Sequence, residues 1–331
     1  MPAAAAPAPL RVAFLGCGQA ARLHATAFGR LGPAVECRYA SRDPQRARDF
    51  AARLGGAGFF PSYEAALESP QVDVVLVLTP PPQHLDWTLA ALAAGKHVVV
   101  EKPPFLRSSD FDAVDAAERK SGRRALVAEN YHYKPLVRTL RGLITGGAVG
   151  QVRFLVVNAM KEQATAGWRA REAETGGGAF YEGGIHWVNF MTSLGLTVSD
   201  AHGLLPAKAA SPERSVLALF AYAEGAVGAL LHSWEAPSPL RGLRLSRIYG
   251  DEGSIAFESN GLLVAVWGRR PRLVLPGFFR DLTGRAAMWR DFADCLRTGR
   301  EPSLSLAHAR RDLELVEAVY ASLADTPRRK G

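Results

Sequence analysis

The chain has 331 residues, of which 48% are hydrophobic, and its 40 lysines and arginines against 32 aspartates and glutamates give a formal net charge of +8. This length suggests two domains, and this hydrophobic content excludes a globally disordered chain. The basic residues are scattered, apart from a short run at Arg328-Arg329-Lys330. The charge therefore suits either a solvated surface or an anionic ligand, and no nucleic-acid motif accompanies it.

The cysteine content and the N-terminal residues indicate the cellular compartment of the protein. Cys17, Cys37 and Cys295 are the only cysteines, and their spacing fits no zinc motif. Such a sparse, odd set is typical of a reducing compartment. Residues 1–9 are rich in Ala and Pro and lack signal-peptide features, so we expect a disordered tail there. We expect a cytoplasmic protein with no metal, no membrane span and no nucleic-acid partner.

The first part of the chain alternates short apolar runs with helical patterns. The runs end at Gly, Pro or charged residues, and they predict buried strands at 10–15, 35–40, 72–78, 97–100 and 125–128. Helices are expected between them at 20–31, 44–54, 84–94 and 110–121. This alternation predicts a doubly wound parallel sheet, a Rossmann domain over residues 10–128, with ligands at the carboxyl ends of the strands.

The second part is mostly β-like. Strands are expected at 152–159, 215–222, 226–234, 243–249, 254–258 and 262–267, and helices at 135–144, 178–194, 286–298 and 306–323. Few crossover helices separate these strands, which favours an antiparallel sheet. We therefore predict an α/β domain followed by an α+β domain over residues 129–325.

A glycine-rich turn follows the first predicted strand and opens a helix. Its G-x-G-x-x-A pattern predicts a dinucleotide site, because small residues let the backbone approach a pyrophosphate and the helix N-terminus offers free N–H groups. The residues are Gly16, Cys17, Gly18, Gln19, Ala20 and Ala21. The alternative is an ordinary strand-to-helix turn.

The second predicted strand ends at residues expected to meet the adenosine ribose. Ser41 and Arg42 stand there, and Arg46 lies one helical turn later. A hydroxyl beside guanidinium groups favours the 2′-phosphate of NADP over NAD. Asp43 is the competing ribose ligand and would favour NAD, and Arg42 could instead be a solvated turn residue.

Two further motifs carry reactive side chains. Lys102 ends the fourth predicted strand within Glu101-Lys102-Pro103, where its ammonium can bond a reacting oxygen. Glu182 and His186 are four residues apart in a predicted helix, so one face would hold both. A neutral His186 could act as general base, with Glu182 fixing its tautomer. The alternatives are a surface turn for Lys102 and a surface pair for Glu182 and His186.

These motifs, taken in order, resemble the glucose–fructose oxidoreductase, inositol dehydrogenase and rhizopine-catabolism (Gfo/Idh/MocA) family from about Leu10 to Tyr320. The resemblance is carried by the glycine turn, 79–84, 94–103, 131–135, 147–150, 168–169, 176–186 and 299–302. It implies a Rossmann domain and an open-faced antiparallel sheet domain, the latter serving substrate binding and oligomerisation over residues 129–325. It also implies a homodimer or homotetramer paired through the sheet faces, and a cis bond between Lys102 and Pro103.

The resemblance also implies site residues. Cofactor contacts are expected, beyond the glycine turn and Ser41, Arg42 and Arg46, from Thr79, Pro80, His84, Glu101, Lys102, Asn130, Trp168 and Arg169. Lys102, His186 and Glu182 are the expected catalytic residues. Substrate contacts are expected from Lys102, Tyr131, Trp168, Tyr181, His186 and Asn189. This chain departs from the family pattern at Glu182 and Asn189, where the family has Asp, and at His132, where it often has Arg.

The expected activity is hydride transfer between NADP, or NAD, and a secondary alcohol or ketone of a sugar or polyol. Alternatives are an NADPH-dependent reductase of keto-sugars or dicarbonyls, a glycoside-processing enzyme with transient redox chemistry, and a nucleotide-binding regulatory protein without turnover.

Overall fold

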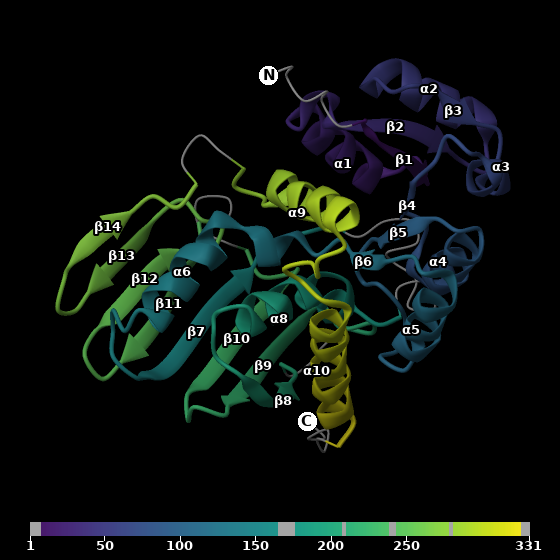
Figure 1. Ribbon diagram of the computed structural model, residues 1–331. Helices are drawn as coiled ribbons and strands as arrows, with labels where there is room; N and C mark the ends of the chain where they lie inside the picture. Colours follow the sequence, from purple (N-terminus) through teal and green to yellow (C-terminus); the bar gives the residue numbers. More distant parts are fainter. Residues whose placement is uncertain (1–7, 165–175, 207–209, 238–242, 278–280, 326–331) are drawn as a thin grey trace, which may run out of the picture. The chain divides into compact units, whose positions relative to one another are not determined.

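The computed structural model describes residues 8–164, 176–206, 210–237, 243–277 and 281–325 (Figure 1). It divides into two compact units. The first unit joins Met1–Ala128 to Arg285–Leu306, and the second joins Glu129–Gly284 to Ala307–Gly331. The segment 285–306 thus groups with the first unit, whereas the sequence placed it in the second domain. Most of the expected N-terminal tail, residues 1–7, lies outside the described residues.

A six-stranded sheet forms the centre of the first unit. Its order is β3-β2-β1-β4-β5-β6, and every neighbouring pair is parallel. The strands are β1 (Leu10–Leu15), β2 (Val35–Ala40), β3 (Phe59–Phe60), β4 (Val74–Val77), β5 (His97–Val100) and β6 (Ala125–Val127). This is the Rossmann strand order, which confirms the predicted fold. The two-residue β3 was not predicted, because so short a segment shows no periodicity.

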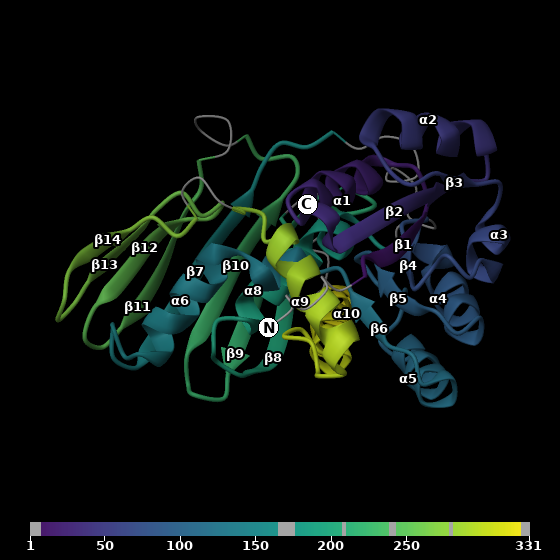
Figure 2. The same ribbon diagram turned by 45° about the horizontal axis from the view of Figure 1, so that its top comes forward.

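Helices surround this sheet. They are α1 (Gln19–Gly29), α2 (Pro44–Leu54), α3 (Tyr63–Glu68), α4 (His84–Ala93), α5 (Asp110–Ser121) and α9 (Arg285–Thr298). Helix α4 packs against α5, and α1 packs against α9 (Figures 1 and 2). Trp289 of α9 explains why the late segment joins this unit, since its fully buried ring packs edge-on against Phe28 of α1.

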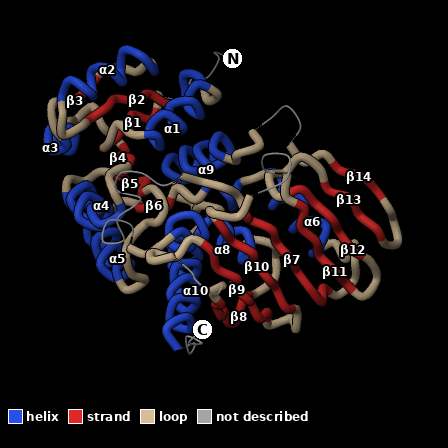
Figure 3. The backbone as a smooth tube through the Cα atoms, turned by 180° about the vertical axis from the view of Figure 1, so that it is seen from behind, coloured by secondary structure: helices blue, strands red, loops and turns tan. Residues whose placement is uncertain are grey.

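The second unit contains an eight-stranded sheet, ordered β14-β13-β12-β11-β7-β10-β9-β8 (Figure 3). The strands are β7 (Val152–Met160), β8 (Val198–Leu204), β9 (Ser215–Tyr222), β10 (Val227–Ser233), β11 (Leu245–Gly250), β12 (Ser254–Glu258), β13 (Val264–Trp267) and β14 (Arg272–Val274). Only the β7–β10 pair among these is parallel, so the sheet is mostly antiparallel, as predicted.

The sheet of the second unit is apolar on both faces but covered on one. Along β7, Leu155, Val157 and Ala159 are buried on the inner face, while Phe154 and Val156 are exposed on the other. Helices of this unit cover the inner face: α6 (Pro135–Thr145), α8 (Ile185–Thr192) and α10 (Leu306–Asp325). The α8 ring of Phe190 stacks on Phe257 of β12, 5.9 Å between centroids.

Candidate active site

The glycine turn of the first unit has the geometry that a dinucleotide pyrophosphate requires. Gly16 has φ +125°, and a Cβ there would lie 2.8 Å from the carbonyl oxygen of Leu78. A Cβ at Gly18 would meet nothing within 4 Å, so space lies before the first turn of α1. No side chain caps that helix, and its first turn holds no acidic residue. Its N–H groups therefore remain available to an anion, and the residues fit the cofactor.

The residues after β2 are arranged around a helix cap. Asp43 accepts a hydrogen bond from the backbone N–H of Gln45, 3.0 Å away, and so caps α2. Arg42 is exposed, and Arg46 donates from Nε to the carbonyl oxygen of Cys17 in the glycine turn at 2.8 Å. Ser41 accepts from the N–H of Asp43 at 3.3 Å. The structure thus brings Arg46 to the glycine turn, bonds Ser41 to the backbone of Asp43 and occupies Asp43 in capping.

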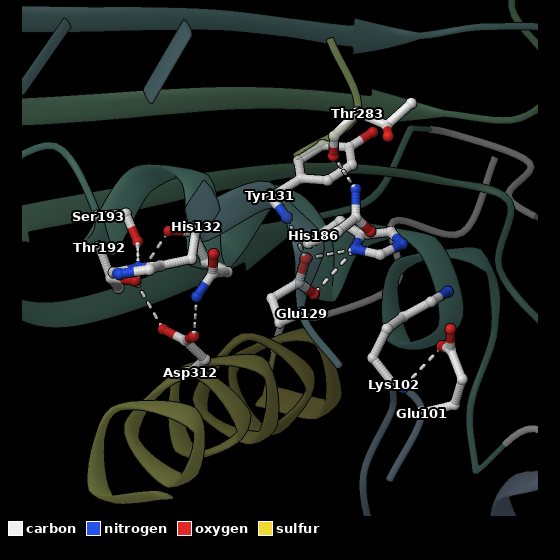
Figure 4. Close-up of polar contacts among 12 residues, drawn as sticks. Glu101, Lys102, Glu129, Tyr131, His132, His186, Thr192, Ser193, Thr283 and Asp312 are labelled. Atoms are coloured by element: carbon white, nitrogen blue, oxygen red, sulfur yellow. Dashed lines mark hydrogen bonds and ion pairs between the residues drawn. The ribbon is translucent and has the colours of Figure 1, made fainter. Parts of the chain in front are cut away.

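A chain of hydrogen bonds fixes Glu101 beside Lys102. The indole of Trp289 donates to Nδ1 of His24 at 2.8 Å, so the other ring nitrogen carries the proton and donates to Glu101 at 3.0 Å. The second carboxylate oxygen accepts from the backbone N–H of Lys102 at 2.9 Å (Figure 4). Burial acts to raise the pKa of Glu101, but the bond from His24 and nearby cations hold it at about 2. Glu101 is therefore an anion that anchors the backbone of Lys102.

His84 joins two loops of the first unit. Its ring nitrogens contact the carbonyl oxygens of Thr79 at 2.7 Å and Pro103 at 2.9 Å, and the side chain is buried. This differs from the expected direct cofactor contact, because both nitrogens are used to hold the backbone after β4 and β5. Thr79 has a buried hydroxyl with no hydrogen-bond partner among the described residues, which suits a ligand there. The Lys102–Pro103 bond is cis, as the resemblance implied.

In the second unit, His186 is held by a carboxylate that the sequence did not point to. Nδ1 of His186 lies 2.7 and 2.8 Å from the two carboxylate oxygens of Glu129 (Figure 4). Glu129 is buried and also accepts from the backbone N–H of Tyr131 at 2.9 Å. Because a carboxylate can only accept, Nδ1 carries the proton and a neutral imidazole has its lone pair at Nε2. That is the tautomer a general base needs.

Aromatic packing restrains the same imidazole. The Tyr131 ring stacks on His186 with 4.5 Å between centroids and 13° between planes. Trp187 meets the Tyr131 ring edge-on, and the ammonium of buried Lys134 lies 4.1 Å from the same ring's centroid. Tyr131, an expected substrate contact, thus lies against His186.

The glycine-rich segment before His186 folds as a π-helical turn, Phe180–Gly184, that leads into α8. Glu213 shapes its start, accepting from the N–H of Phe180 at 2.8 Å, and a Cβ at Gly178 would collide with that carboxylate. Glu182 is buried within this turn. A π turn is wider than an α turn. The four-residue spacing therefore does not ensure that Glu182 and His186 lie on one face, as it would in a regular α-helix.

Two expected substrate contacts lie inside the protein. Asn189 is 0% exposed, and its amide donates to Asp312 at 2.7 Å. Thr192 donates to the other oxygen of Asp312 at 2.6 Å (Figure 4). Asn189 therefore belongs to a buried network between α8 and α10. This differs from the expected contact, because the amide of Asn189 donates to Asp312 instead. Tyr181 is also buried.

The remaining predicted site residues are Asn130, Trp168 and Arg169, of which the structure describes only Asn130. Asn130 donates from its amide to the carbonyl oxygen of Thr283 at 2.6 Å, a contact within the second unit. Trp168 and Arg169 lie outside the described residues. Within the described residues, no three His, Cys, Asp or Glu side chains gather as metal ligands, and no helix has the length and hydrophobicity to cross a membrane.

Glu129, His24 and Trp289 are the residues that the sequence-based prediction missed. Glu129 had a usable signal, because it closely follows β6 as Lys102 follows β5. His24 and Trp289 are 265 positions apart and had none.

Two family models match this chain. The model described as an oxidoreductase family with an NAD-binding Rossmann fold matches residues 10–129, and the Gfo/Idh/MocA C-terminal domain matches residues 137–256. The chain belongs to the Gfo/Idh/MocA oxidoreductase family. This confirms the resemblance inferred from the motifs and the NAD-binding character of the first unit.

Curated relatives include sugar-processing enzymes. A dTDP-3,4-didehydro-2,6-dideoxy-alpha-D-glucose 3-reductase of Saccharopolyspora spinosa is 34% identical over 182 residues, 54% of each chain. A D-glucoside 3-dehydrogenase of Escherichia coli K12 is 29% identical over 194 residues, 57% of this chain and 55% of the relative. The chain thus spans about half the length of the curated relatives it matches.

Solved structures agree along nearly the whole chain. An oxidoreductase from Thermotoga maritima has a TM-score of 0.82 at 25% identity, covering 95% of this chain and 96% of that one. A levoglucosan dehydrogenase in complex with NADH and levoglucosan has a TM-score of 0.84 at 22% identity, covering 96% and 98%. At such identity the latter likeness concerns the fold.

Proposed function

We propose that this family member is an NAD(P)-dependent dehydrogenase or reductase that transfers hydride at a secondary alcohol or ketone of a sugar, sugar derivative or polyol. The observation that carries the proposal is the imidazole of His186, held through Nδ1 by buried Glu129. Relatives that act on sugars support the substrate class. The proposed catalytic residues are His186 and Lys102, with Glu129 as the positioning carboxylate.

The proposed roles follow from the groups themselves. A bound nicotinamide dinucleotide supplies the acceptor or donor of hydride. In oxidation, the O–H bond of the substrate breaks and its proton passes to Nε2 of His186, as hydride leaves the same carbon. The ammonium of Lys102 donates to that oxygen and stabilises its developing negative charge. Reduction reverses these transfers.

The proposal is tested by turnover. Purified protein is assayed with NAD⁺ and NADP⁺ against polyols and sugars, and with the reduced cofactors against keto-sugars and dicarbonyls. His186→Ala is expected to lower kcat by about 10²–10⁴-fold while cofactor binding persists. Full activity in His186→Ala, or cofactor binding without turnover on any compound, would refute the role of His186 or the enzyme proposal.

We propose NADP as the preferred cofactor. Asp43 caps α2, so the side chain that would favour NAD has another partner, while Ser41 and Arg42 remain at the end of β2. Arg42→Ala should raise the dissociation constant of NADP more than that of NAD, as measured by cofactor fluorescence. Equal effects on both cofactors would contradict the assignment.

We propose that two copies pair through the uncovered sheet face. Phe154 is 57% exposed, and the backbone register places Val227 and Tyr249 beside it on the two neighbouring strands. Leu245, 53% exposed, extends this apolar patch. A patch of this kind on an open sheet is typical of a subunit interface. Light scattering should give a homodimer or homotetramer that Phe154→Glu dissociates; a monomeric parent protein would refute the pairing.

We propose a cytoplasmic location, because Cys17, Cys37 and Cys295 are all free and buried. Fractionation of producing cells tests it, and recovery in a secreted fraction would contradict it.

A further inference from the structure

Three nitrogen-bearing side chains gather on the inner face of the second unit's sheet. His232 is on β10 and Trp234 follows two residues later, while Arg244 immediately precedes β11. Strand β7 lies between β10 and β11, and the small Ala159 of β7 pairs with His232. The cluster of Arg244, His232 and Trp234 therefore spans three neighbouring strands, with a small residue between them.

This cluster adjoins the segment that carries His186. The indole of Trp234 packs on Gly183 of the π turn so closely that a Cβ there would lie 2.6 Å from Cζ2. The Phe180 ring of the same turn meets the His232 ring edge-on, with 5.7 Å between centroids.

Each member of the cluster has a buried nitrogen without a hydrogen-bond partner. Arg244 is 7% exposed and His232 and Trp234 are each 3% exposed. The unpartnered atoms, within the described part of the chain, are Nε of Arg244, Nδ1 of His232 and Nε1 of Trp234. Buried polar atoms are seldom left unsatisfied, and three in one place indicate a bound group that completes them.

The charge of Arg244 indicates that the bound group is an anion. Its Nη2 donates to the amide oxygen of Asn260, and its guanidinium lies 5.3 Å from the centroid of the Trp187 ring. The carboxylate of Glu258 accepts from the backbone N–H of Arg244 at 3.5 Å and also from Asn260 and Leu262, but it does not bond the guanidinium. No carboxylate among the described residues pairs with that guanidinium. A buried cation without a counter-ion is unfavourable, so an anion in contact with it would be bound strongly.

The charges near His232 are also positive. Burial, together with the positive charges of Lys161 and Arg244, lowers the pKa of His232 to about 3. His232 is thus a neutral imidazole in a positive field at neutral pH, able to donate one hydrogen bond without adding charge.

We propose that Arg244, His232 and Trp234 form a subsite for an oxyanion of the substrate, a carboxylate or a phosphate, next to the carbon that reacts at His186. The inference rests on the proposed function, since it names the class of sugar or polyol that the same site takes. The substrate is an acidic sugar derivative: either a sugar acid, or a phosphorylated or nucleotide-linked sugar. A guanidinium suits both kinds of oxyanion because its planar N–H groups match their geometry.

The test is a matched panel built on one hexose: the neutral sugar, its uronate, its 6-phosphate and its nucleoside-diphosphate ester. We expect kcat/KM for one anionic member to exceed that of the neutral sugar by about 10- to 100-fold, the worth of a hydrogen bond to a charged group. The preferred member identifies the source of the oxyanion. Arg244→Gln should lower kcat/KM for that member at least tenfold more than for the neutral sugar.

The matched control is Arg247→Gln, because Arg247 lies three residues later on β11 with its side chain exposed. It should leave the anionic preference intact. Thermal unfolding supplies a readout without turnover: the preferred anion should raise the Tm of the parent protein and of Arg247→Gln, but not of Arg244→Gln.

The outcomes separate the two proposals. If neutral sugars turn over as well as anionic ones, or if Arg244→Gln affects both equally, water satisfies the cluster and the subsite is refuted while the hydride transfer stands. If nothing turns over but an anion stabilises the protein through Arg244, the subsite stands and the enzymatic proposal fails. A Tm shift equal in both arginine variants also refutes the subsite.

Discussion

Replacing Glu129 by glutamine tests the central contact of the proposed active site. Both carboxylate oxygens lie within 2.8 Å of Nδ1 of His186, and the side chain is buried. Glutamine keeps the shape and an acceptor oxygen but removes the charge that stabilises the imidazolium when His186 takes a proton. A charge-assisted hydrogen bond contributes about 1.5–3 kcal/mol, and each 1.36 kcal/mol is tenfold in rate. We therefore expect kcat to fall by about 10- to 150-fold.

The assay separates a positioning role from a structural one. Steady-state kinetics should show the loss in kcat, with the KM for substrate and the cofactor dissociation constant changed little, because Glu129 acts through His186. Glu182→Gln, the variant of the carboxylate that the sequence suggested, should lower kcat less. Glu252→Gln at the surface, where Glu252 pairs with Arg269, controls for the loss of one negative charge.

A folded Glu129→Gln protein with a kcat within twofold of the parent would refute the reasoning. So would a larger loss of kcat in Glu182→Gln than in Glu129→Gln, since the orienting carboxylate would then be the other one.

Three further changes test the first unit. Gly16→Ala should abolish cofactor binding in calorimetry and cost roughly 1–3 kcal/mol of unfolding free energy, because alanine disfavours φ +125° and its Cβ would lie 2.8 Å from the oxygen of Leu78; unchanged binding would contradict this. Trp289→Phe keeps an aromatic ring but removes the donor to His24, and urea unfolding should show a loss of about 1–3 kcal/mol; a stability equal to the parent's would show that this bond contributes nothing. The pKa of Glu101 is lowered from 4.5 to about 2, so its contribution to stability is complete above pH 4.5 and is lost as the pH falls toward 2. Glu101→Gln should be less stable than the parent above pH 4.5, with a gap that narrows below it, and a gap that stays constant with pH would refute this.

The first unit could be predicted from sequence because its signals are local. Fully buried runs such as Val74–Val77 are apolar without interruption, and each is followed by residues that end a strand. In the second unit, β8 was missed because its seven residues include Ser, Asp, His and Gly, which weaken any strand pattern. β14 was missed because it has three residues.

The active-site prediction placed Gly16 and Lys102 just after the ends of strands, where the structure has them, because a residue type and a strand end coincide there. Their roles stay predictions. It paired His186 with Glu182 because that inference assumed a regular α-helix. The π turn Phe180–Gly184 changes the spacing, and the carboxylate on His186 comes from Glu129, 57 residues earlier. Contacts of this kind depend on how distant segments pack, which no local pattern records.

The segment Arg285–Leu306 returns to the first unit, and this limits which fragments of the protein can fold on their own. Because α9 supplies Trp289 to the core around His24 and Phe28, a fragment ending at Ala128 would lack that indole and leave an aromatic hole beside the helix that follows the glycine turn. During synthesis, the Rossmann sheet can form early, but its core closes only after the ribosome has passed residue 306. Until then the nascent chain exposes Phe28, which is where we expect chaperones to bind and truncated forms to aggregate.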